Sequence, residues 1–434
     1  MRLSIIGSGY VGTTVAACFA DLGHDVVNID IDEEIVAAIN AGEAPIHEPG
    51  LQDLITEHAG SDGTGRLRAT TDYDAVLDTD VTFLCLPTPQ NDDGSIDLSI
   101  METGATQLGA TLAEKTDWHT VVVKSTVVPG STEDVLTPML EAESGKTAGE
   151  GFGVGMNPEF LREGTAVEDF LNPDKLVLGA DDDRALGDAK EVFRPLVELT
   201  DAPLVNTDTR TAEMIKYANN GFLATKLSLI NDLGNICKEL GIDAYEVADA
   251  IGLDDRISER FLRSGVGWGG SCFEKDVSAI IATAEECGYE PSLLNAAFEI
   301  NDRQPERLIE LTADHVDLDG ARIAVLGLAF KPGTDDMRNS RAIPVIRGLR
   351  ERGATVTAYD PVATENAKEY LDDVDYADSA EAALTGADGA VIVTDWDEFA
   401  TLDDEFDAMG DPVVVDGRRI VERRDGITYE GLTW

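Results

Sequence analysis

The beginning of the chain alternates between short apolar runs and a helical stretch. Leu3 to Ile6 form one apolar run, and residues 26–29 form a second one after Gly23. Between them the apolar positions recur at helical spacing, at Val15, Ala16, Phe19 and Leu22. Short apolar runs bounded by turn residues are typical of strands buried on both faces of a sheet. The pattern therefore predicts a strand, a helix and a second strand.

This alternation continues to about residue 205. With helical stretches between them, further strand-like runs lie at 81–86, 120–123, 152–156 and 176–178. Such alternation is the pattern of a doubly wound parallel sheet. Polar clusters follow three of these runs, at 87–89, 124–126 and 157–159. Because ligands bind at the carboxyl ends of strands in such sheets, we expect a binding site there.

A long amphipathic helix follows from about 209 to 240, and the pattern stays helical to about 312. A second series of strand-like runs then begins, at 322–327, 355–360, 390–393 and 413–416. We therefore expect an α/β fold with two Rossmann-like doubly wound parallel-sheet domains. A long central helix and a helical dimerisation region would join them. The predicted domains are residues 1–205, 206–312 and 313–434.

The net charge of −51, from 84 acidic and 33 basic residues, is dispersed along the chain. With 43% apolar residues and clear strand patterns, a disordered chain is not expected. The charge instead indicates the solvated acidic surface of a halophilic protein, in which salt screens the self-repulsion. Nucleic acid is excluded as a partner by the same charge.

Other features bear on location and metals. The sequence has no apolar run approaching 18 residues and no signal-peptide pattern, so we expect a cytoplasmic protein without a membrane partner. The five cysteines lack metal-ligand or disulfide spacing, and the five histidines form no ligand-spaced pair. We therefore expect reduced thiols and no metal.

A dinucleotide fingerprint lies between the first strand and helix. Gly7, Gly9 and Gly12 have the G-x-G-x-x-G spacing, and Asp30 ends the second strand. The glycines would let the backbone approach a pyrophosphate at the helix N-terminus. Asp30 would accept hydrogen bonds from the ribose hydroxyls and repel a 2′-phosphate. The expected cofactor is NAD rather than NADP.

A second glycine-rich segment, residues 267–276, precedes the helical pattern of 277–287. Cys272 would lie at the helix start, where the backbone N–H groups and the helix dipole favour a thiolate. Asp276 would lie one turn later on the same face. A nucleophile with a carboxylate in reach suits covalent catalysis. The alternative is a glycine loop that caps an ordinary helix, with Cys272 as buried filler.

Further polar pairs have two interpretations each. Lys216 and Asn220 are four residues apart on the long helix, so they either stabilise an oxyanion or form a solvated face. Glu159 and Glu163 have the same spacing, but Asn157-Pro158-Glu159 is also an ordinary helix start. In the second α/β block, the cations that suit a diphosphate are Lys331, Arg338, Arg418 and Arg419.

These motifs together resemble the UDP-glucose/GDP-mannose dehydrogenase family, and most closely its UDP-glucose 6-dehydrogenases. The shared series runs from residue 7 to 419: GSGYVG, LPTP, KSTV, NPEFLREG, KYANN, GGSCFEKD, FKPGTDDMR and DGRR. The resemblance implies two successive oxidations of a sugar C6 alcohol to a carboxylate, with two NAD reduced. UDP-glucose is the implied substrate, and a homodimer or a multiple of it the implied assembly.

The resemblance also implies roles in the chemistry. Cys272 would attack the aldehyde intermediate and pass through a thiohemiacetal to a thioester. Asp276 would assist water and proton transfer, and Lys216 with Asn220 would bind the C6 oxygen. Glu159 resembles the acid/base of thioester hydrolysis. Thr126 and Glu163 would hold a catalytic water.

Binding residues are implied in the same way. The residues similar to NAD contacts are Gly7, Gly9, Tyr10, Val11, Gly12, Asp30, Thr88, Thr126, Glu163, Lys275 and Arg338. Those similar to UDP-sugar contacts are Phe160, Leu161, Arg162, Glu163, Lys216, Asn220, Arg263, Gly267, Gly269, Lys331 and Arg418, with Arg256 reaching across a dimer. One departure is Ile35, where many relatives carry a basic residue near the adenosine ribose.

Other functions remain open at this point. GDP-mannose and UDP-N-acetylhexosamine 6-dehydrogenases share the motif series. A two-electron hydroxyacid dehydrogenase can also use a Lys-x-x-x-Asn pair, but it has no use for Cys272 or for a second nucleotide fold. A catalytically silent NAD-binding scaffold would not need cysteine, aspartate, lysine and asparagine together.

Overall fold

The computed structural model describes residues 1–60, 63–410 and 412–434. The chain divides into two compact units, Met1–Asn219 and Asn220–Trp434, and the division falls within the long helix α8 (Thr209–Glu239). A division into three domains stays a prediction.

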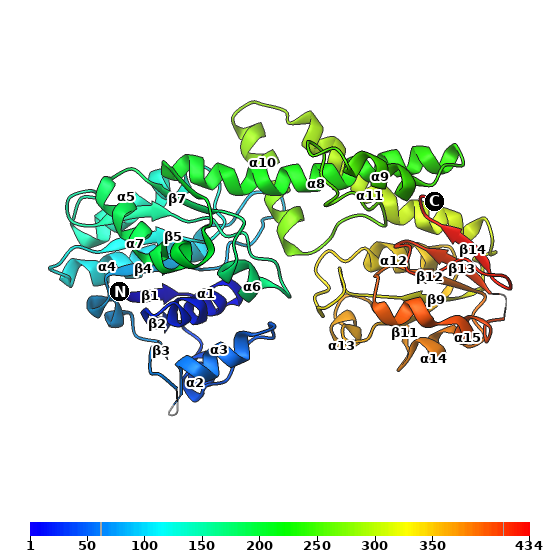
Figure 1. The fold of residues 1–434 in the computed structure, drawn as a ribbon, viewed down its shortest axis with the longest axis horizontal. Coiled ribbons are helices and arrows are strands. Elements are labelled where there is room, and N and C mark those ends of the chain that lie inside the picture. Colours follow the sequence, from blue (N-terminus) through cyan, green and yellow to red (C-terminus); the bar gives the residue numbers. More distant parts are fainter. Residues whose placement is uncertain (61–62, 411) are drawn as a thin grey trace. The chain divides into compact units, whose positions relative to one another are not determined.

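The first unit contains an eight-stranded sheet in the order β3-β2-β1-β4-β5-β6-β7-β8. Its first six strands have the strand order of a dinucleotide-binding fold. The strands are β1 (Arg2–Ile6), β2 (Asp25–Ile29), β3 (Leu67–Thr70), β4 (Val81–Leu84), β5 (Thr120–Val123), β6 (Gly153–Met156), β7 (Leu176–Ala180) and β8 (Leu204–Thr207). The predicted runs of apolar residues therefore do form one buried sheet (Figure 1).

One strand does not have the predicted direction. β7 pairs antiparallel with β6, whereas a parallel sheet was predicted throughout. The connecting residues return to the carboxyl end of β6, where the Asn157 side chain donates a hydrogen bond to the Val177 carbonyl at 2.9 Å. Because β7 starts at this end, it has to run back along β6.

Both faces of this sheet are covered. Alternate residues of a strand point to opposite faces, and so Leu3 and Ile5 belong to one apolar core and Ile6 to the other. The first core includes α1 (Tyr10–Asp21), α2 (Glu33–Ala41), α3 (Leu51–His58), α6 (Ala166–Leu171) and α7 (Asp183–Thr200). The second includes η1 (Tyr73–Asp78), α4 (Ser99–Glu114), η2 (Ser131–Leu136) and α5 (Thr137–Ser144). This burial on both faces explains the continuous apolar runs.

The second unit repeats the order of the first six strands of the first unit. Its six-stranded sheet has the order β11-β10-β9-β12-β13-β14, with every pair parallel. The strands are β9 (Arg322–Leu326), β10 (Thr355–Tyr359), β11 (Asp375–Tyr376), β12 (Gly389–Ile392), β13 (Val413–Asp416) and β14 (Thr428–Gly431), drawn in yellow to red in Figure 1. The sheet packs against α12 (Ala342–Glu351) on one face and α14 (Ala380–Leu384), η3 (Asp397–Thr401) and α15 (Asp403–Phe406) on the other. The short helix α13 (Thr364–Ala367) follows β10.

Helices also connect the two sheets in the sequence. After α8 these are α9 (Ala244–Gly252), α10 (Ser271–Glu286) and α11 (Ser292–Ala313). Within the described parts of the chain, none of the helices has the length and apolar character needed to cross a membrane.

Candidate active site

The fingerprint glycines of the first unit are required by close packing. A Cβ on Gly12 would lie 1.9 Å from the Gly7 carbonyl oxygen, and Gly7 itself has a φ of +99°. A Cβ on Gly9, in contrast, would meet nothing within 4 Å, so the space above this residue is open. The tight turn and the open position are those that a pyrophosphate needs.

The start of α1 is suited to an anion. Gly9 is its N-cap residue and provides no side-chain cap, and the first turn has no acidic residue. The first backbone N–H groups of the helix therefore remain available for a phosphate. Asp30 lies beside this turn, because its carboxylate accepts the Ser8 N–H at 2.5 Å. The residues present fit NAD.

The carboxyl ends of β4, β5 and β6 bring the predicted polar residues together. The Thr88 hydroxyl donates to the Thr126 carbonyl at 2.9 Å, so these two predicted cofactor residues are neighbours. Lys124 and Asn157 are the first residues after β5 and β6, and the Lys124 ammonium donates to the Asn157 amide oxygen at 2.8 Å. Lys124 belongs to the motif KSTV, but the sequence suggested no role for it.

Glu159 lies in the segment that follows β6. It is only 7% exposed, and its carboxylate is 3.3 Å from the Lys216 ammonium of α8. The segment is not helical before α6 begins at Ala166. The interpretation of Asn157-Pro158-Glu159 as a helix start is therefore wrong, because the Asn157 side chain bonds Lys124 and Val177 instead of capping a helix.

The rest of this segment is held by Glu48, which the sequence did not indicate. The buried Glu48 carboxylate accepts the backbone N–H groups of Gly164, at 2.8 Å, and Ala166, at 2.6 Å. The Tyr10 hydroxyl donates to Glu48 and accepts the Gly164 N–H at 3.0 Å. Burial, with Glu48, raises the pKa of Tyr10. Glu163 therefore lies in a loop anchored beside the NAD fingerprint.

Phe160, Leu161 and Arg162 of this segment each have a different environment. The Phe160 ring lies under two lysines, with the Lys175 ammonium 4.2 Å and the Lys216 ammonium 5.7 Å from its centroid. Leu161 packs against the first apolar core. Arg162 forms an ion pair with Asp169 at 2.5 Å.

In the second unit, Cys272 is the second residue of α10, as predicted. It is exposed, so its interpretation as buried filler is wrong. The N-cap residue Gly270 provides no side-chain cap, and the helix dipole at this end favours a thiolate. The structure therefore presents a thiol at a helix N-terminus.

Asp276 lies one turn further along α10 and is 1% exposed. Its carboxylate oxygens have separate partners: the Lys275 ammonium at 2.7 Å and the Asn220 amide at 2.6 Å. Asn220 is itself one turn from Lys216 on α8, so helix geometry places both on one side of α8. Lys275 thus pairs with Asp276.

The glycine-rich loop before Cys272 is tightly held. A Cβ on Gly267 would lie 2.5 Å from the Asn301 amide oxygen, and one on Gly269 would lie 2.3 Å from the Asn339 carbonyl. The Gly270 N–H donates to the Arg338 carbonyl at 3.0 Å. The loop is therefore fixed against the segment that carries Lys331 and Arg338.

The predicted diphosphate cations differ in their surroundings. Arg418 lies under the glycine-rich loop and donates to the Val393 carbonyl at 2.7 Å and the Gly267 carbonyl at 3.4 Å. The Lys331 ammonium lies 5.4 Å from the Phe330 ring centroid. The other arginines pair with nearby acids: Arg256 with Asp254, Arg263 with Asp249, Arg338 with Asp336 and Arg419 with Asp243.

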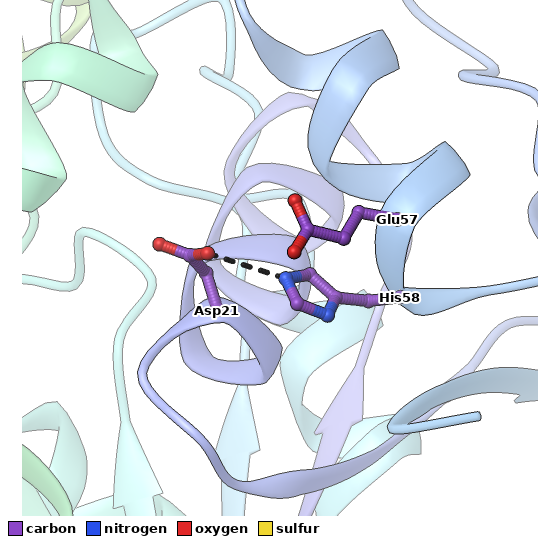
Figure 2. A group of neighbouring side chains, drawn as sticks. All are labelled: Asp21, Glu57 and His58. Atoms are coloured by element: carbon purple, nitrogen blue, oxygen red, sulfur yellow. Dashed lines mark hydrogen bonds and ion pairs between the residues drawn. The ribbon is translucent and has the colours of Figure 1, made fainter. Parts of the chain in front are cut away.

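One group of side chains in the described ranges has the composition of a metal site (Figure 2). Asp21 ends α1, and Glu57 and His58 end α3, with ligand atoms within 4.8 Å of one another. Both His58 nitrogens already have partners, Thr64 at 3.1 Å and Asp21 at 3.2 Å. The group also lies at the opposite end of α1 from the fingerprint. It is a hydrogen-bonded histidine away from the fingerprint end of α1.

The fold and these residues define an NAD-binding dehydrogenase with two Rossmann-type units and a cysteine at a helix start. Comparison with known proteins gives the family. Residues 1–197, 210–303 and 324–423 match the NAD binding, central and UDP binding domains of the UDP-glucose/GDP-mannose dehydrogenase family. The chain belongs to this family.

Individual relatives cover the full chain. It is 64% identical to UDP-glucose 6-dehydrogenase AglM of Haloferax volcanii over 433 residues, which is 100% of both chains. It is 42% identical to UDP-glucose 6-dehydrogenase of Rhizobium meliloti, with 100% of this chain and 98% of the relative covered. A UDP-glucose dehydrogenase structure from Pyrobaculum islandicum aligns with a TM-score of 0.91 at 41% identity, covering 100% of this chain and 98% of that one.

Proposed function

We propose that this protein is an NAD-dependent UDP-glucose 6-dehydrogenase that oxidises the C6 alcohol of UDP-glucose to a carboxylate. The observation that carries the proposal is the exposed Cys272 at the start of α10, with Asp276 and Asn220 hydrogen-bonded one turn along. An ordinary two-electron alcohol oxidation needs no such nucleophile. The relatives named UDP-glucose 6-dehydrogenase support the choice of substrate.

NAD is held at the fingerprint turn of the first unit. When bound there, NAD would supply the oxidising power for both oxidations, with one NAD reduced in each. The start of α1 takes the pyrophosphate and Asp30 the ribose hydroxyls. Thr88, Thr126, Lys275 and Arg338 complete the proposed cofactor contacts.

Lys216 and Asn220 position the C6 oxygen. In the first oxidation the C6 hydroxyl gives its proton to water, a transfer that Asp276 assists, as the hydride leaves, and an aldehyde forms. The Lys216 ammonium and the Asn220 amide donate hydrogen bonds to the oxygen as its negative charge develops. Asp276 orients Asn220, because its carboxylate accepts the Asn220 amide N–H at 2.6 Å.

Cys272 makes the second oxidation possible. Its thiolate adds to the aldehyde carbon, and the aldehyde oxygen takes a proton to give a thiohemiacetal. Loss of the second hydride and of this proton leaves a thioester. Water then adds to the thioester carbon, the C–S bond breaks, and the acid and the free thiol are released. Glu159 accepts the proton of this water, which Thr126 and Glu163 hold in place.

The residues proposed for UDP-sugar binding lie partly in the segment after β6 and partly in the second unit. Phe160, Leu161, Arg162 and Glu163 contact the sugar in this proposal. Lys331 and Arg418 bind the diphosphate, since both are cations at the carboxyl ends of strands β9 and β13. The glycine-rich residues from Arg263 to Gly269 let the backbone come close to the bound UDP-sugar.

The number of NADH molecules released per substrate tests this function. We expect two from UDP-glucose at high salt, with UDP-glucuronate as the product. One NADH would indicate a two-electron hydroxyacid dehydrogenase, and none would indicate an NAD-binding scaffold. In a substrate panel, higher kcat/KM with GDP-mannose or a UDP-N-acetylhexosamine would reassign the chain within its family.

The active assembly is a homodimer or a multiple of one. Large apolar side chains are exposed along α8 and after it, among them Phe222 at 71% and Leu240 at 67%. A second copy that covers them removes this apolar surface from water. Arg256, whose side chain is also exposed, then reaches the neighbouring substrate. An active monomer in light scattering would contradict this assembly. We place the enzyme in the cytoplasm.

A further inference from the structure

Asp416 is a buried carboxylate at the end of β13. It is 0% exposed, and each of its two oxygens accepts two hydrogen bonds. Its Oδ1 accepts the backbone N–H groups of Arg418 and Arg419, both at 2.8 Å. Its Oδ2 accepts the Val421 N–H at 2.9 Å and the Tyr429 hydroxyl at 3.2 Å. A buried carboxylate needs such partners to offset the loss of water, and here they lie mainly in the backbone of the turn that follows.

This turn has a backbone that is costly to form. Arg419 has a φ of +59°, in the left-handed region that residues with a side chain rarely adopt. The turn is also pressed against its neighbours, since a Cβ on Gly417 would lie 2.3 Å from Val266 Cγ2 and 2.7 Å from the Ile392 carbonyl oxygen. Strain of this kind persists only where the surrounding contacts hold it. The Oδ1 atom of Asp416 provides such contacts at both arginines.

The two consecutive arginines of the turn have different partners. The Arg419 guanidinium donates to both oxygens of the Asp243 carboxylate, at 2.6 and 2.8 Å. The Arg418 guanidinium instead donates to two backbone carbonyls, that of Val393 at 2.7 Å and that of Gly267 at 3.4 Å. Carbonyl oxygens orient a guanidinium without neutralising it. Arg418 is therefore the arginine of this turn that keeps its charge for a diphosphate.

We propose that Asp416 is a positioning residue for substrate binding, which fixes the turn that directs Arg418 toward the diphosphate of the UDP-sugar. The inference rests on the proposed function, which assigns the diphosphate to Lys331 and Arg418. Asp416 does not contact the substrate in this proposal. It acts through the backbone N–H of Arg418, and by holding the turn it keeps one arginine for the ligand and the next one for the fold.

The test compares Asp416→Ala with the wild type at high salt, in calorimetric titrations with UDP and in steady-state kinetics. Without Oδ1 the turn is no longer held, and Arg418 loses its fixed direction. The Kd for UDP and the KM for UDP-glucose should both rise about tenfold, the effect of losing one charged hydrogen bond. The kcat should stay within about twofold, because the diphosphate is bound equally in the substrate and in the transition state. The Kd for NAD should be unchanged.

Two further variants show which oxygen of Asp416 acts on the substrate. Asp416→Asn keeps an oxygen at the Oδ1 position for the N–H groups of Arg418 and Arg419, and it places its amide against the Val421 N–H, which should cost stability. Its Kd for UDP should nevertheless stay near the wild-type value. Tyr429→Phe removes a donor from Oδ2 alone and should also leave the Kd for UDP unchanged. A merely structural Asp416 would instead give UDP affinities that follow the melting temperatures.

A double-mutant cycle tests whether Asp416 acts through Arg418. Arg418→Met should itself raise the Kd for UDP, because it removes the guanidinium. Adding Asp416→Ala to this variant should change the Kd by less than about twofold, since residues that act through one contact are not additive. Two independent effects that multiply would contradict the inference.

Arg419→Pro tests the same turn if Asp416→Ala fails to fold. Proline removes the second N–H that Oδ1 accepts and cannot adopt a positive φ. The Kd for UDP should rise as expected for Asp416→Ala. Arg419→Asn is the matched control, because asparagine loses the same guanidinium but tolerates the left-handed conformation, and it should bind UDP as the wild type does.

A wild-type Kd for UDP in folded Asp416→Ala, or in Arg419→Pro, would overturn the inference, while release of two NADH per UDP-glucose would leave the proposed function intact. Release of a single NADH by the wild type would overturn the proposed function, and the UDP titrations would still decide the role of Asp416.

Discussion

At the scale of single residues, Gly9 and Gly12 of the fingerprint are glycines for different physical reasons. Gly12 is needed because its Cα lies against the Gly7 carbonyl, whereas Gly9 faces open space with ordinary extended φ and ψ of −71° and −165°. One glycine therefore serves the fold and the other serves the ligand. The sequence motif alone does not distinguish the two roles.

Alanine substitutions separate these roles. Gly12→Ala should destabilise the protein by about 1–3 kcal/mol, because its Cβ overlaps backbone. Gly9→Ala should leave the melting temperature unchanged and weaken NAD binding, measured by calorimetry. Equal losses of stability in both variants would contradict this assignment.

Asp30 should determine the choice of cofactor. Its carboxylate lies beside the fingerprint turn, where a 2′-phosphate would meet a like charge. We expect kcat/KM with NAD to exceed that with NADP by at least about tenfold. Asp30→Ala should lower the ratio of kcat/KM with NAD to kcat/KM with NADP. Equal kcat/KM values in the wild type would rule out this role.

At the scale of elements, the sequence predicted those whose signals are local. Buried apolar runs identified the strands, and the start of α10 at Cys272 followed from its glycines and helical periodicity. The antiparallel pairing of β7 could not be predicted, because an apolar run does not show whether a strand lies parallel or antiparallel to its neighbour. The segment after β6 was ambiguous for a related reason: Asn157 is a favourable cap, yet distant residues Lys124 and Val177 compete for its side chain.

Glu48 is the clearest example of a contact that the sequence hides. It lies more than a hundred residues from the loop that it holds, so no spacing pattern reveals it. Its carboxylate accepts two backbone N–H groups near the start of α6. The position of Glu163 therefore depends on a residue outside every quoted motif.

Glu48→Gln should loosen this loop. Loss of one acceptor leaves a buried N–H group unpaired, at a cost of about 1–3 kcal/mol. Glu57→Gln is the matched control, an exposed glutamate near the end of α3, and should stay within about 0.5 kcal/mol. Denaturant unfolding measures both. A Glu48 variant as stable as the Glu57 variant would show that the contact contributes little.

At the scale of the whole molecule, the two main features are the acidic net charge and the repeated strand order. The first six strands of the first unit have the same order as the six of the second, and in both units a glycine with positive φ follows the first strand, Gly7 at +99° and Gly327 at +89°. The net charge of −51 has to be tolerated by both units. Local pairs such as Arg338–Asp336 use only a minority of the acids, since acidic residues number 84 against 33 basic ones.

Salt should therefore control folding and activity. The Debye length falls to about 3 Å at 1 M ionic strength, which screens repulsion between neighbouring carboxylates. We expect full activity and maximal melting temperature only near or above about 1 M salt. Unchanged activity and melting temperature in dilute buffer would refute the interpretation of the surface as halophilic.

The most direct test of the account is product analysis of Cys272→Ser. The variant keeps the size of the side chain but loses the nucleophilicity of a thiolate and its capacity as a leaving group. It should bind UDP-glucose and NAD, and any products should be aldehyde or a trapped ester instead of free UDP-glucuronate. NADH formation and product mass are measured together. Carboxylate formation within about tenfold of the wild-type rate would show that Cys272 is structural and contradict the covalent mechanism.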